Sequence, residues 1–379
     1  MNIFSITMTL VSPPYDDGPK NIVIGIARRL KKHHFIFMSF ISRRFKRENN
    51  ITFIASPFQN RPSLKISFMQ QVFILFVISF KFKKIDIFQF FFTPRKYFSI
   101  IFNHLLEKLN KRSIQIISSI HALYDANIGV DIKSLLFSDA VVVHSDYSKM
   151  RLEKEGLSNI IRIYPGVDLE RFSAKNLNQE SFFKREANDV IHIAYPAALR
   201  VLKNSYSYEG LCKIIMLVRE KIKNVKFVLA CKVREKKDTL LEEEFKKTAK
   251  EFDVKDSIIF FRTVDDMPNL LNSCDMVIFP SDKGPVGILE IPLVLLEASA
   301  LSKPVIYSNV PPLNELKQHS IGICLDDMSA DSYAKAIIDL VYNKNERERV
   351  ASLSRSAIIK DFTIDNMASQ YDAIYNTLG

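Results

Sequence analysis

Residues 279–306 read FPSDKGPVGILEIPLVLLEASALSKPVI, and this stretch decides the fold. The apolar run 276–279 ends at a Pro-Ser pair, as a buried parallel strand does where it delivers the chain to a sheet edge. Pro292 suits the first turn of a helix over 293–301, because its φ is fixed and its missing N–H is not needed there. Lys-Pro at 303–304 stops that helix before a second apolar strand. The stretch therefore predicts strand, loop, helix and strand, the repeating unit of an α/β fold.

Two carboxylates flank the start of this helix, Glu290 just before it and Glu297 inside it. Backbone N–H groups at a helix start, here at Ile291 and Leu293, form an anion site that could receive a phosphate. Carboxylates beside that site suit sugar or ribose hydroxyls, which donate hydrogen bonds to them. The alternative is that both glutamates are solvated helix charges, and this segment alone leaves both interpretations open.

The segment resembles the donor-binding motif of the GT-B family 4 glycosyltransferases, the glycosyl transferases group 1. In that family two glutamates flank a Gly-rich turn, and the helix reads like Leu-Glu-Ala-Met-Ala-x-Gly-Lys-Pro-Val-Ile. Residues 295–306 match most of this pattern, so Glu297 corresponds to the second glutamate. The family has seven residues between the glutamates, whereas Glu290 and Glu297 have six between them, and Leu289 holds the family's position. The resemblance implies donor binding by Glu297 and a catalytic place near the sugar for Glu290.

Length and composition indicate two globular domains. The chain has 379 residues and is 47% hydrophobic, which favours packed domains over disorder. Its four cysteines have no paired spacing, so we interpret them as reduced core residues of a cytoplasmic protein. No set of metal ligands is visible, and no metal or cofactor is expected.

The positive charge is concentrated in the first quarter of the chain. Residues 1–100 hold 16 Lys+Arg against 4 Asp+Glu, a balance of +12, while the whole chain balances at +11. The same residues contain 17 of the 29 phenylalanines. Cations mixed with aromatics suit an anionic membrane surface, so residues 28–100 predict peripheral attachment to the inner face of the cell membrane. We disfavour nucleic acid, which could use the same charge, because no nucleic-acid motif is recognisable.

No secretory signal is expected at the start of the chain, because residues 1–11 lack a basic start and a small-residue cleavage site. Residues 66–80 are uncharged but shorter than the ~20 residues that span a bilayer. They predict a buried or membrane-surface helix. The strand expected at 2–11 leads into a turn cluster and a helix over 21–32. Gly18 in that turn could help to hold a phosphate or could only make the turn, and in the resembled family this loop lines the cleft between the domains.

A histidine follows the strand expected at 113–120. His121 at its carboxyl end could face a ligand or make a structural hydrogen bond. Members of the resembled family place a histidine here against the donor sugar, which implies a catalytic role for His121. Pro-Gly-Val-Asp at 165–168 resembles the Asn-Gly-Val-Asp that closes the family's first domain, so the boundary is expected just after Phe172.

Two cations follow the first strand of the second domain, expected at 190–195. Arg200 and Lys203 are natural partners for a diphosphate, because charge-assisted contacts to phosphate are strong. On spacing alone a solvated loop pair is the commoner explanation, and only the resemblance favours diphosphate binding. The resembled family has an Arg and a Lys here that contact the donor diphosphate, usually five apart, whereas these two are three apart.

The resemblance implies a GT-B fold, an α/β architecture of two Rossmann-like domains facing across a cleft. Residues 1–172 and the C-terminal helix 362–379, crossing back, would form the acceptor-side domain, and residues 173–361 the nucleotide-sugar domain. The implied activity is metal-independent, retaining transfer of a hexose from a nucleotide-sugar to a glycan or lipid-linked acceptor. The alternatives are a catalytically silent GT-B partner or membrane scaffold, and a nucleotide-sugar epimerase.

Overall fold

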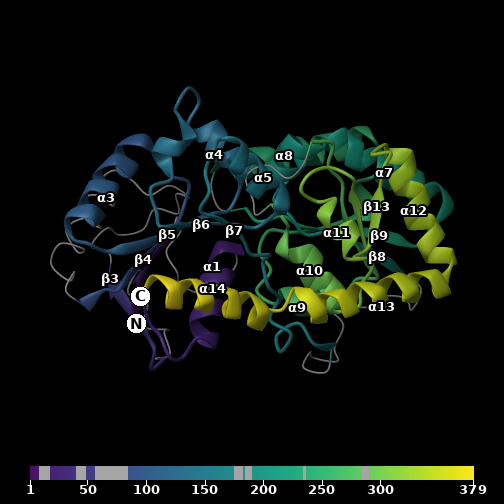
Figure 1. Ribbon diagram of the computed structural model, residues 1–379. Helices are drawn as coiled ribbons and strands as arrows, with labels where there is room; N and C mark the ends of the chain where they lie inside the picture. Colours follow the sequence, from purple (N-terminus) through teal and green to yellow (C-terminus); the bar gives the residue numbers. More distant parts are fainter. Residues whose placement is uncertain are drawn as a thin grey trace. The chain divides into compact units, whose positions relative to one another are not determined.

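The computed structural model describes residues 1–7, 18–39, 48–55, 84–174, 182–183, 190–233, 236–283 and 290–379. The chain divides into two compact units, each with its own sheet (Figure 1). Unit 1 consists of Met1–Gly166, Gly287–Glu290 and Ile364–Gly379. Unit 2 consists of Val167–Val286 and Ile291–Thr363, so residues 167–172 group with unit 2.

The sheet of unit 1 has seven parallel strands in the order β3-β2-β1-β4-β5-β6-β7. The strands are β1 (Asn2–Thr7), β2 (His34–Ser39), β3 (Ile51–Ala55), β4 (Ile87–Phe91), β5 (Arg112–Ile117), β6 (Ala140–Val143) and β7 (Ile160–Arg162). The helices are α1 (Gly18–Arg29), α3 (Lys96–Lys108), α4 (Ile120–Ala126), η2 (Ile132–Leu135), α5 (Asp146–Lys154) and α14 (Ile364–Leu378). Figure 1 shows α3 and α4 on one side of this sheet and α1 with α14 on the other.

The central strand β4 shows why these residues make a parallel sheet. All five of its side chains are buried, because helices cover both faces of the sheet. On one face Phe90 packs edge-on against Phe98 and Phe102 of α3, with ring centroids 6.1 and 5.2 Å away. The remaining described phenylalanines among residues 1–100 are also core residues or half-buried, so they do not form the exposed aromatic surface that composition suggests.

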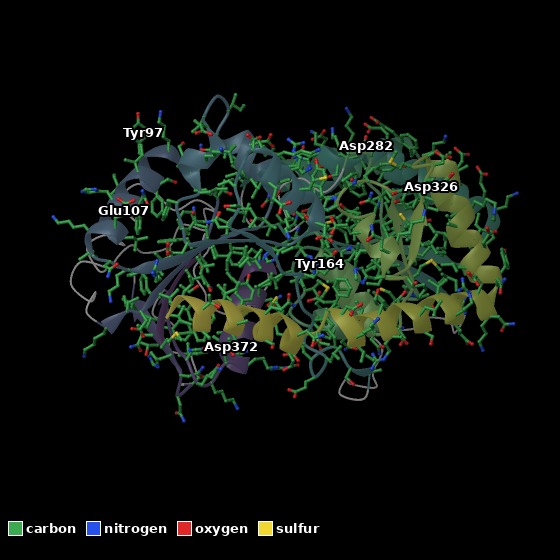
Figure 2. The ribbon with its side chains drawn as sticks, viewed as in Figure 1. Tyr97, Glu107, Tyr164, Asp282, Asp326 and Asp372 are labelled. Carbon is green, nitrogen blue, oxygen red and sulfur yellow. The ribbon has the colours of Figure 1, made fainter. Side chains whose placement is uncertain are left out.

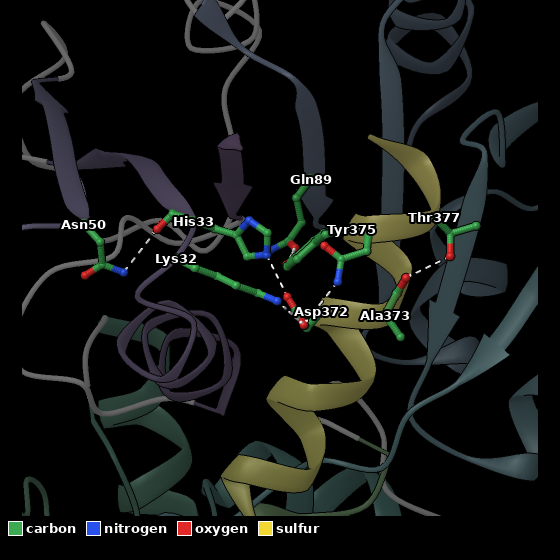
Figure 3. Close-up of polar contacts among 9 residues, drawn as sticks. Lys32, His33, Asn50, Gln89, Asp372, Ala373, Tyr375 and Thr377 are labelled. Carbon is green, nitrogen blue, oxygen red and sulfur yellow. Dashed lines mark hydrogen bonds and ion pairs between the residues drawn. The ribbon is translucent and has the colours of Figure 1, made fainter.

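Helix α14 is held on unit 1 by polar contacts to α1 and the sheet (Figure 3). Asp372 accepts a hydrogen bond from Lys32 Nζ at 2.7 Å and lies 2.7 Å from His33 Nε2. The hydroxyl of Tyr375 donates to the Gln89 side chain on β4. The return of the C-terminal helix to the first unit, expected from the sequence, is confirmed.

The sheet of unit 2 has six parallel strands in the order β10-β9-β8-β11-β12-β13. The strands are β8 (Ile191–Tyr195), β9 (Val225–Ala230), β10 (Ile258–Phe261), β11 (Met276–Phe279), β12 (Val305–Ser308) and β13 (Ile323–Leu325). The helices are α6 (Leu199–Ser205), α7 (Tyr208–Lys221), α8 (Lys236–Glu251), η4 (Lys255–Ser257), α9 (Met267–Ser273), α10 (Leu293–Ala300), α11 (Glu315–Gln318), α12 (Ala330–Tyr342) and α13 (Lys344–Asp361). The sequence of residues 279–306 thus forms the strand, loop, helix and strand that it predicts.

Several expected boundaries are wrong. Helix α1 is Gly18–Arg29, so it begins and ends three residues before the range expected, 21–32. Strand β5 ends at Ile117, and Ser119 caps a new helix by accepting a hydrogen bond from the Ala122 amide at 3.2 Å. The interpretations of the turn cluster before Gly18 and of residues 66–80 lie outside the described residues. Among the helices that the structure describes, none has the length and apolar character to cross a membrane.

Candidate functional site

The strand order of unit 2 places a switch point between β8 and β11. Strands that follow β8 and β11 in the chain go to opposite sides of this pair, so the connections after the two strands diverge. Ligands of open parallel sheets bind outside the carboxyl ends of such a pair. The chain after β11 is fixed to the end of α6, because the Asp282 amide donates to the Ser205 carbonyl at 2.6 Å. The Ser281 hydroxyl donates to the same carbonyl at 3.2 Å.

The two cations expected to bind a diphosphate lie on α6, not on a loop as predicted. Arg200 lines a small hollow together with Lys232 and Asp238, and the rest of its wall comes from Ala198, Leu199, Val233 and Leu241. Lys203 turns elsewhere and pairs with Glu244 of α8, its Nζ lying 2.5 Å from Oε1. Both side chains of that pair are close to half exposed, so the pair contributes at most ~1 kcal/mol to stability.

Lys232 is a candidate that the sequence reasoning missed. It follows the carboxyl end of β9, the strand paired with β8, and shares the hollow with Arg200. The signal was available, because a cation two residues after a buried apolar strand is placed at the ligand-binding edge of a parallel sheet.

Glu297 is enclosed in the second turn of α10. Its neighbours on the helix are buried, and only 7% of Glu297 itself is exposed. Burial disfavours the charged carboxylate and raises its pKa from 4.5 to about 7, while the charge of Arg171 acts in the opposite direction. Pro292 directly precedes the helix as its N-cap residue and makes no side-chain capping bond.

Glu290 has a different environment, inside unit 1. Its Oε1 accepts hydrogen bonds from the Ile120 amide at 2.5 Å and from the Ser148 hydroxyl, and its Oε2 accepts one from the Ser145 hydroxyl at 2.5 Å. Only 1% of the residue is exposed. Glu290 therefore joins the first turns of α4 and α5, where unpaired N–H groups and the helix dipoles favour a negative charge.

His121 is the second residue of α4 and not the last residue of a strand as predicted. Its ring lies 6.2 Å from the Tyr147 ring at an interplanar angle of 27°. Partial burial lowers its pKa, Asp125 opposes this and Arg151 adds to it, which favours a neutral imidazole at neutral pH. Gly18 opens α1, and the loop that precedes it lies outside the described residues.

A buried histidine next to this network was not foreseen. His144 follows β6 and is fully buried, and its Nδ1 lies 2.9 Å from the Ile163 carbonyl oxygen. Burial lowers its pKa to about 4, so the ring is neutral. Its Nε2 has no hydrogen-bond partner in the described part of the chain.

Comparison with known proteins shows a likeness to one family. Residues 181–356 match the family described as Glycosyl transferases group 1. The match covers most of unit 2, and most of unit 1 lies outside it. An uncharacterized glycosyltransferase of Methanocaldococcus jannaschii is 29% identical over 125 residues, which are 32% of this chain and 31% of that protein. The matched region therefore spans about a third of that relative's length.

Solved structures share the whole architecture of this chain. A glycosyltransferase from Rickettsia africae superposes with a TM-score of 0.73 at 18% identity, covering 100% of this chain and 98% of the other. HepE of Anabaena, solved in complex with UDP and glucose, gives a TM-score of 0.75 at 14% identity and covers 100% of both chains. At these identities the likeness shows the fold, and it confirms the predicted GT-B architecture.

The potential metal ligands that the structure describes are dispersed. Across the described ranges, His, Cys, Asp and Glu form no group of three or more that could hold a metal ion. The four cysteines are unpaired, with Cys212, Cys231 and Cys274 buried and Cys324 half-buried. Arg200 and Lys232 line one hollow in unit 2, whereas Lys203 and Glu297 are not among the residues of its wall.

Proposed function

We propose that this protein is a retaining glycosyltransferase that transfers a hexose from a nucleotide-diphosphate sugar to a glycan or lipid-linked acceptor at a membrane surface. The match of residues 181–356 to the glycosyl transferases group 1 supports the reaction class. The observation that carries the proposal is that Arg200 and Lys232 line one small hollow within the matched residues, with Lys232 just beyond the carboxyl end of β9. HepE, whose structure contains UDP and glucose, supports the type of donor.

In this proposal, Arg200 and Lys232 hold the donor diphosphate, and Lys203 joins them when it leaves Glu244. The amides of Ile291 and Leu293 add hydrogen-bond donors at the start of α10, where the helix dipole favours negative charge. Glu297 accepts hydrogen bonds from ribose hydroxyls. Cations and dipoles already in position stabilise the charge that develops on the leaving diphosphate, so transfer is expected to proceed without a divalent metal.

We retain Glu290 and His121 as the proposed catalytic residues at the sugar. A neutral His121 can donate a hydrogen bond to a sugar hydroxyl or accept one from it. The Ile120 amide and the Ser145 and Ser148 hydroxyls that donate to Glu290 belong to unit 1. A sugar hydroxyl would therefore have to replace one of these donors or share an oxygen with it. Gly18 stays a proposed residue of the ligand-facing loop.

Nucleotide binding tests the proposal on the full chain. We expect UDP and UDP-glucose to raise the melting temperature, because a ligand of the native state stabilises it by mass action. Arg200→Ala and Lys232→Ala are expected to weaken the nucleotide affinity about tenfold each, the scale of one charge-assisted phosphate contact. Lys213→Ala is the matched control, because Lys213 is an exposed lysine of α7 that pairs with Asp331 of α12.

Two results would contradict the donor site. One is the absence of any stabilisation by a panel of nucleoside diphosphates and their sugars. The other is an equal loss of affinity in Lys213→Ala and Arg200→Ala, which would indicate a general charge effect.

A catalytically silent GT-B partner or scaffold is the second candidate. The full engagement of Glu290 and the Lys203–Glu244 pair favour it, since both tie up groups expected to meet the donor. Product analysis separates the possibilities. Binding of UDP-sugars without turnover would support the silent partner, conversion of the sugar without an acceptor would support an epimerase, and transfer lost in Glu297→Ala would support the transferase.

A further inference from the structure

Helix α3 of unit 1 carries a concentration of exposed apolar side chains. Tyr97 is 81% exposed, Ile100 is 52% exposed and Ile101 is 48% exposed. Together with Leu109 at the C-cap, they make four of the eleven large hydrophobic side chains that are exposed in the described ranges. Figure 2 shows Tyr97 directed away from the helix towards the outside of unit 1. Single exposed apolar residues are ordinary, but a group of them on one short helix is not.

These side chains share one face of the helix. At 100° per residue, Tyr97, Ile100, Ile101, His104 and Lys108 fall within about 60° of one direction. We call this set the α3 outer face. His104 and Lys108 are exposed as well. The face is thus an apolar patch that begins at Tyr97 and passes into a basic end at Lys108.

The exposure does not come from a helix that is poorly anchored. On its inner side Phe98, Phe102 and Leu106 are buried in the core that includes Phe88 and Phe90. The Ser99 hydroxyl donates to the Leu135 carbonyl at 3.0 Å, which fixes the rotation of the helix. The outer face is therefore presented by a rigid element.

Positive charge borders the patch at both ends. Arg95 and Lys96 stand exposed at the start of α3, and Lys108 stands exposed at its end. Glu107 is the only carboxylate of the helix, and it accepts a hydrogen bond from Asn103 at 2.9 Å. An apolar strip between cations is complementary to a surface with anionic groups above an apolar layer.

We propose that the α3 outer face binds the surface of a bilayer that contains anionic phospholipid. The helix lies in the plane of the interface, with Tyr97, Ile100 and Ile101 at the boundary between headgroups and acyl chains. Lys96 and Lys108 meet the lipid phosphates. Its 13 residues extend only ~20 Å, which suits lying on a membrane and not crossing it.

This inference rests on the proposed function, which places the acceptor at a membrane surface. It adds that α3 is the element that contacts the membrane. The composition-based prediction assigned that contact to the aromatic residues of 28–100 in general, but their described phenylalanines are inside the core or half-buried. A second copy of the chain suits the face less well. An antiparallel helix pair would place Lys96 of one copy against Lys108 of the other, and like charges repel.

Vesicle flotation of the full chain tests the proposal. The probes are vesicles of phosphatidylcholine alone and vesicles of phosphatidylcholine with ~30% phosphatidylglycerol. The second kind has an anionic surface that attracts basic segments. We expect at least tenfold tighter binding to the anionic vesicles. The triple change Tyr97→Ser, Ile100→Ser and Ile101→Ser is expected to reduce that binding tenfold or more. Lys96→Glu with Lys108→Glu is expected to remove the preference for anionic vesicles.

Leu240→Ser is the matched control, because Leu240 is 57% exposed on α8 of unit 2. Its vesicle binding is expected to equal that of the wild type. Melting temperature verifies that each variant folds, and stabilisation by UDP reports the donor site separately from the membrane contact. If the triple variant fails to fold, Tyr97→Ser alone and the charge-reversal variant decide the question.

Two outcomes would overturn the proposal. The first is vesicle binding by the folded triple variant that equals the wild type. The second is a concentration-dependent dimer that the same substitutions abolish, with no vesicle binding by the wild type, which would assign the face to a second copy of the chain.

Discussion

Glu290 and Glu297 are separated by six residues in the sequence and are both nearly inaccessible to solvent, yet they lie in opposite electrostatic surroundings. Glu290 belongs to unit 1, where an amide and two hydroxyls donate to its oxygens. Glu297 belongs to unit 2, where apolar neighbours on α10 enclose it and raise its pKa to about 7. Hydrogen-bond donors stabilise a buried carboxylate, and apolar burial stabilises the neutral acid.

The difference teaches that residue type and spacing do not determine what a carboxyl group does. A carboxylate that binds three donors organises the polypeptide around it. A carboxyl whose pKa is close to neutrality can change its charge when a ligand arrives, as catalytic carboxyl groups in apolar pockets do. Four substitutions, ordered from the largest expected effect to the smallest, test this contrast.

Glu290→Ala is expected to lower the free energy of unfolding by about 3 kcal/mol or more, because it leaves the Ile120 amide and two serine hydroxyls buried without an acceptor. Urea unfolding at neutral pH measures the change. Glu153→Ala on the exposed side of α5 is the control, and it should change stability by less than ~0.5 kcal/mol. Equal stabilities for the two variants would show that the Glu290 contacts do not hold unit 1 together.

Glu297→Gln is expected to remove a pH dependence. Because folding raises the pKa of Glu297, its contribution to stability is complete below pH 4.5 and is lost as the pH rises through about 7. Between these values the wild type should lose on the order of 2 to 3 kcal/mol more than the variant. Unfolding at a series of pH values measures this, with the exposed Glu244→Gln as control, and parallel curves for wild type and Glu297→Gln would contradict it.

Ser145→Ala is expected to cost about 1 to 2 kcal/mol, since it removes both the cap of α5 and one donor to Glu290. In a double-mutant cycle with Glu290→Ala the two costs should fall short of additive, because they share one hydrogen bond. Ser356→Ala, on an exposed position of α13, serves as the control. If the two costs are fully additive, the Ser145–Glu290 hydrogen bond does not contribute to stability, which would contradict this prediction.

Lys203→Ala is expected to change stability by less than ~0.5 kcal/mol, because the Lys203–Glu244 pair is solvated. Its effect on UDP affinity should be smaller than that of Arg200→Ala. Calorimetric titration of both variants with UDP makes the comparison. A larger loss in Lys203→Ala would return the main diphosphate contact to Lys203.

The sequence predicted the architecture well where local patterns determine structure. The strands expected at 190–195 and 276–279 are β8 and β11, and Lys-Pro at 303–304 separates α10 from β12 as expected. Buried parallel strands can be read from sequence because both of their faces must be apolar. The short strand β13 and the helix α8 were not predicted. The first is only three half-buried residues, and the second is largely polar, with four buried residues.

The site could be predicted less completely, because its geometry depends on contacts between distant residues. Helix α4 begins at Ile120 because Ser119 caps it, which turned His121 from a strand end into a helix residue. The partner of Lys203 is 41 positions away, and the donors to Glu290 are 142 to 170 positions away. Motif spacing carries no information about such partners. Lys232 could have been found by asking which cations follow each strand of the second sheet.

The return of α14 to unit 1 has a consequence for recombination between relatives of this protein. A single crossover near residue 166 would exchange one sheet and leave the new first unit with a foreign last helix, whose partners for Lys32, His33 and Gln89 would no longer be matched. Hybrids with a new second unit would therefore need a second junction near residue 363. The short segment that carries Glu290 would also have to match the first unit.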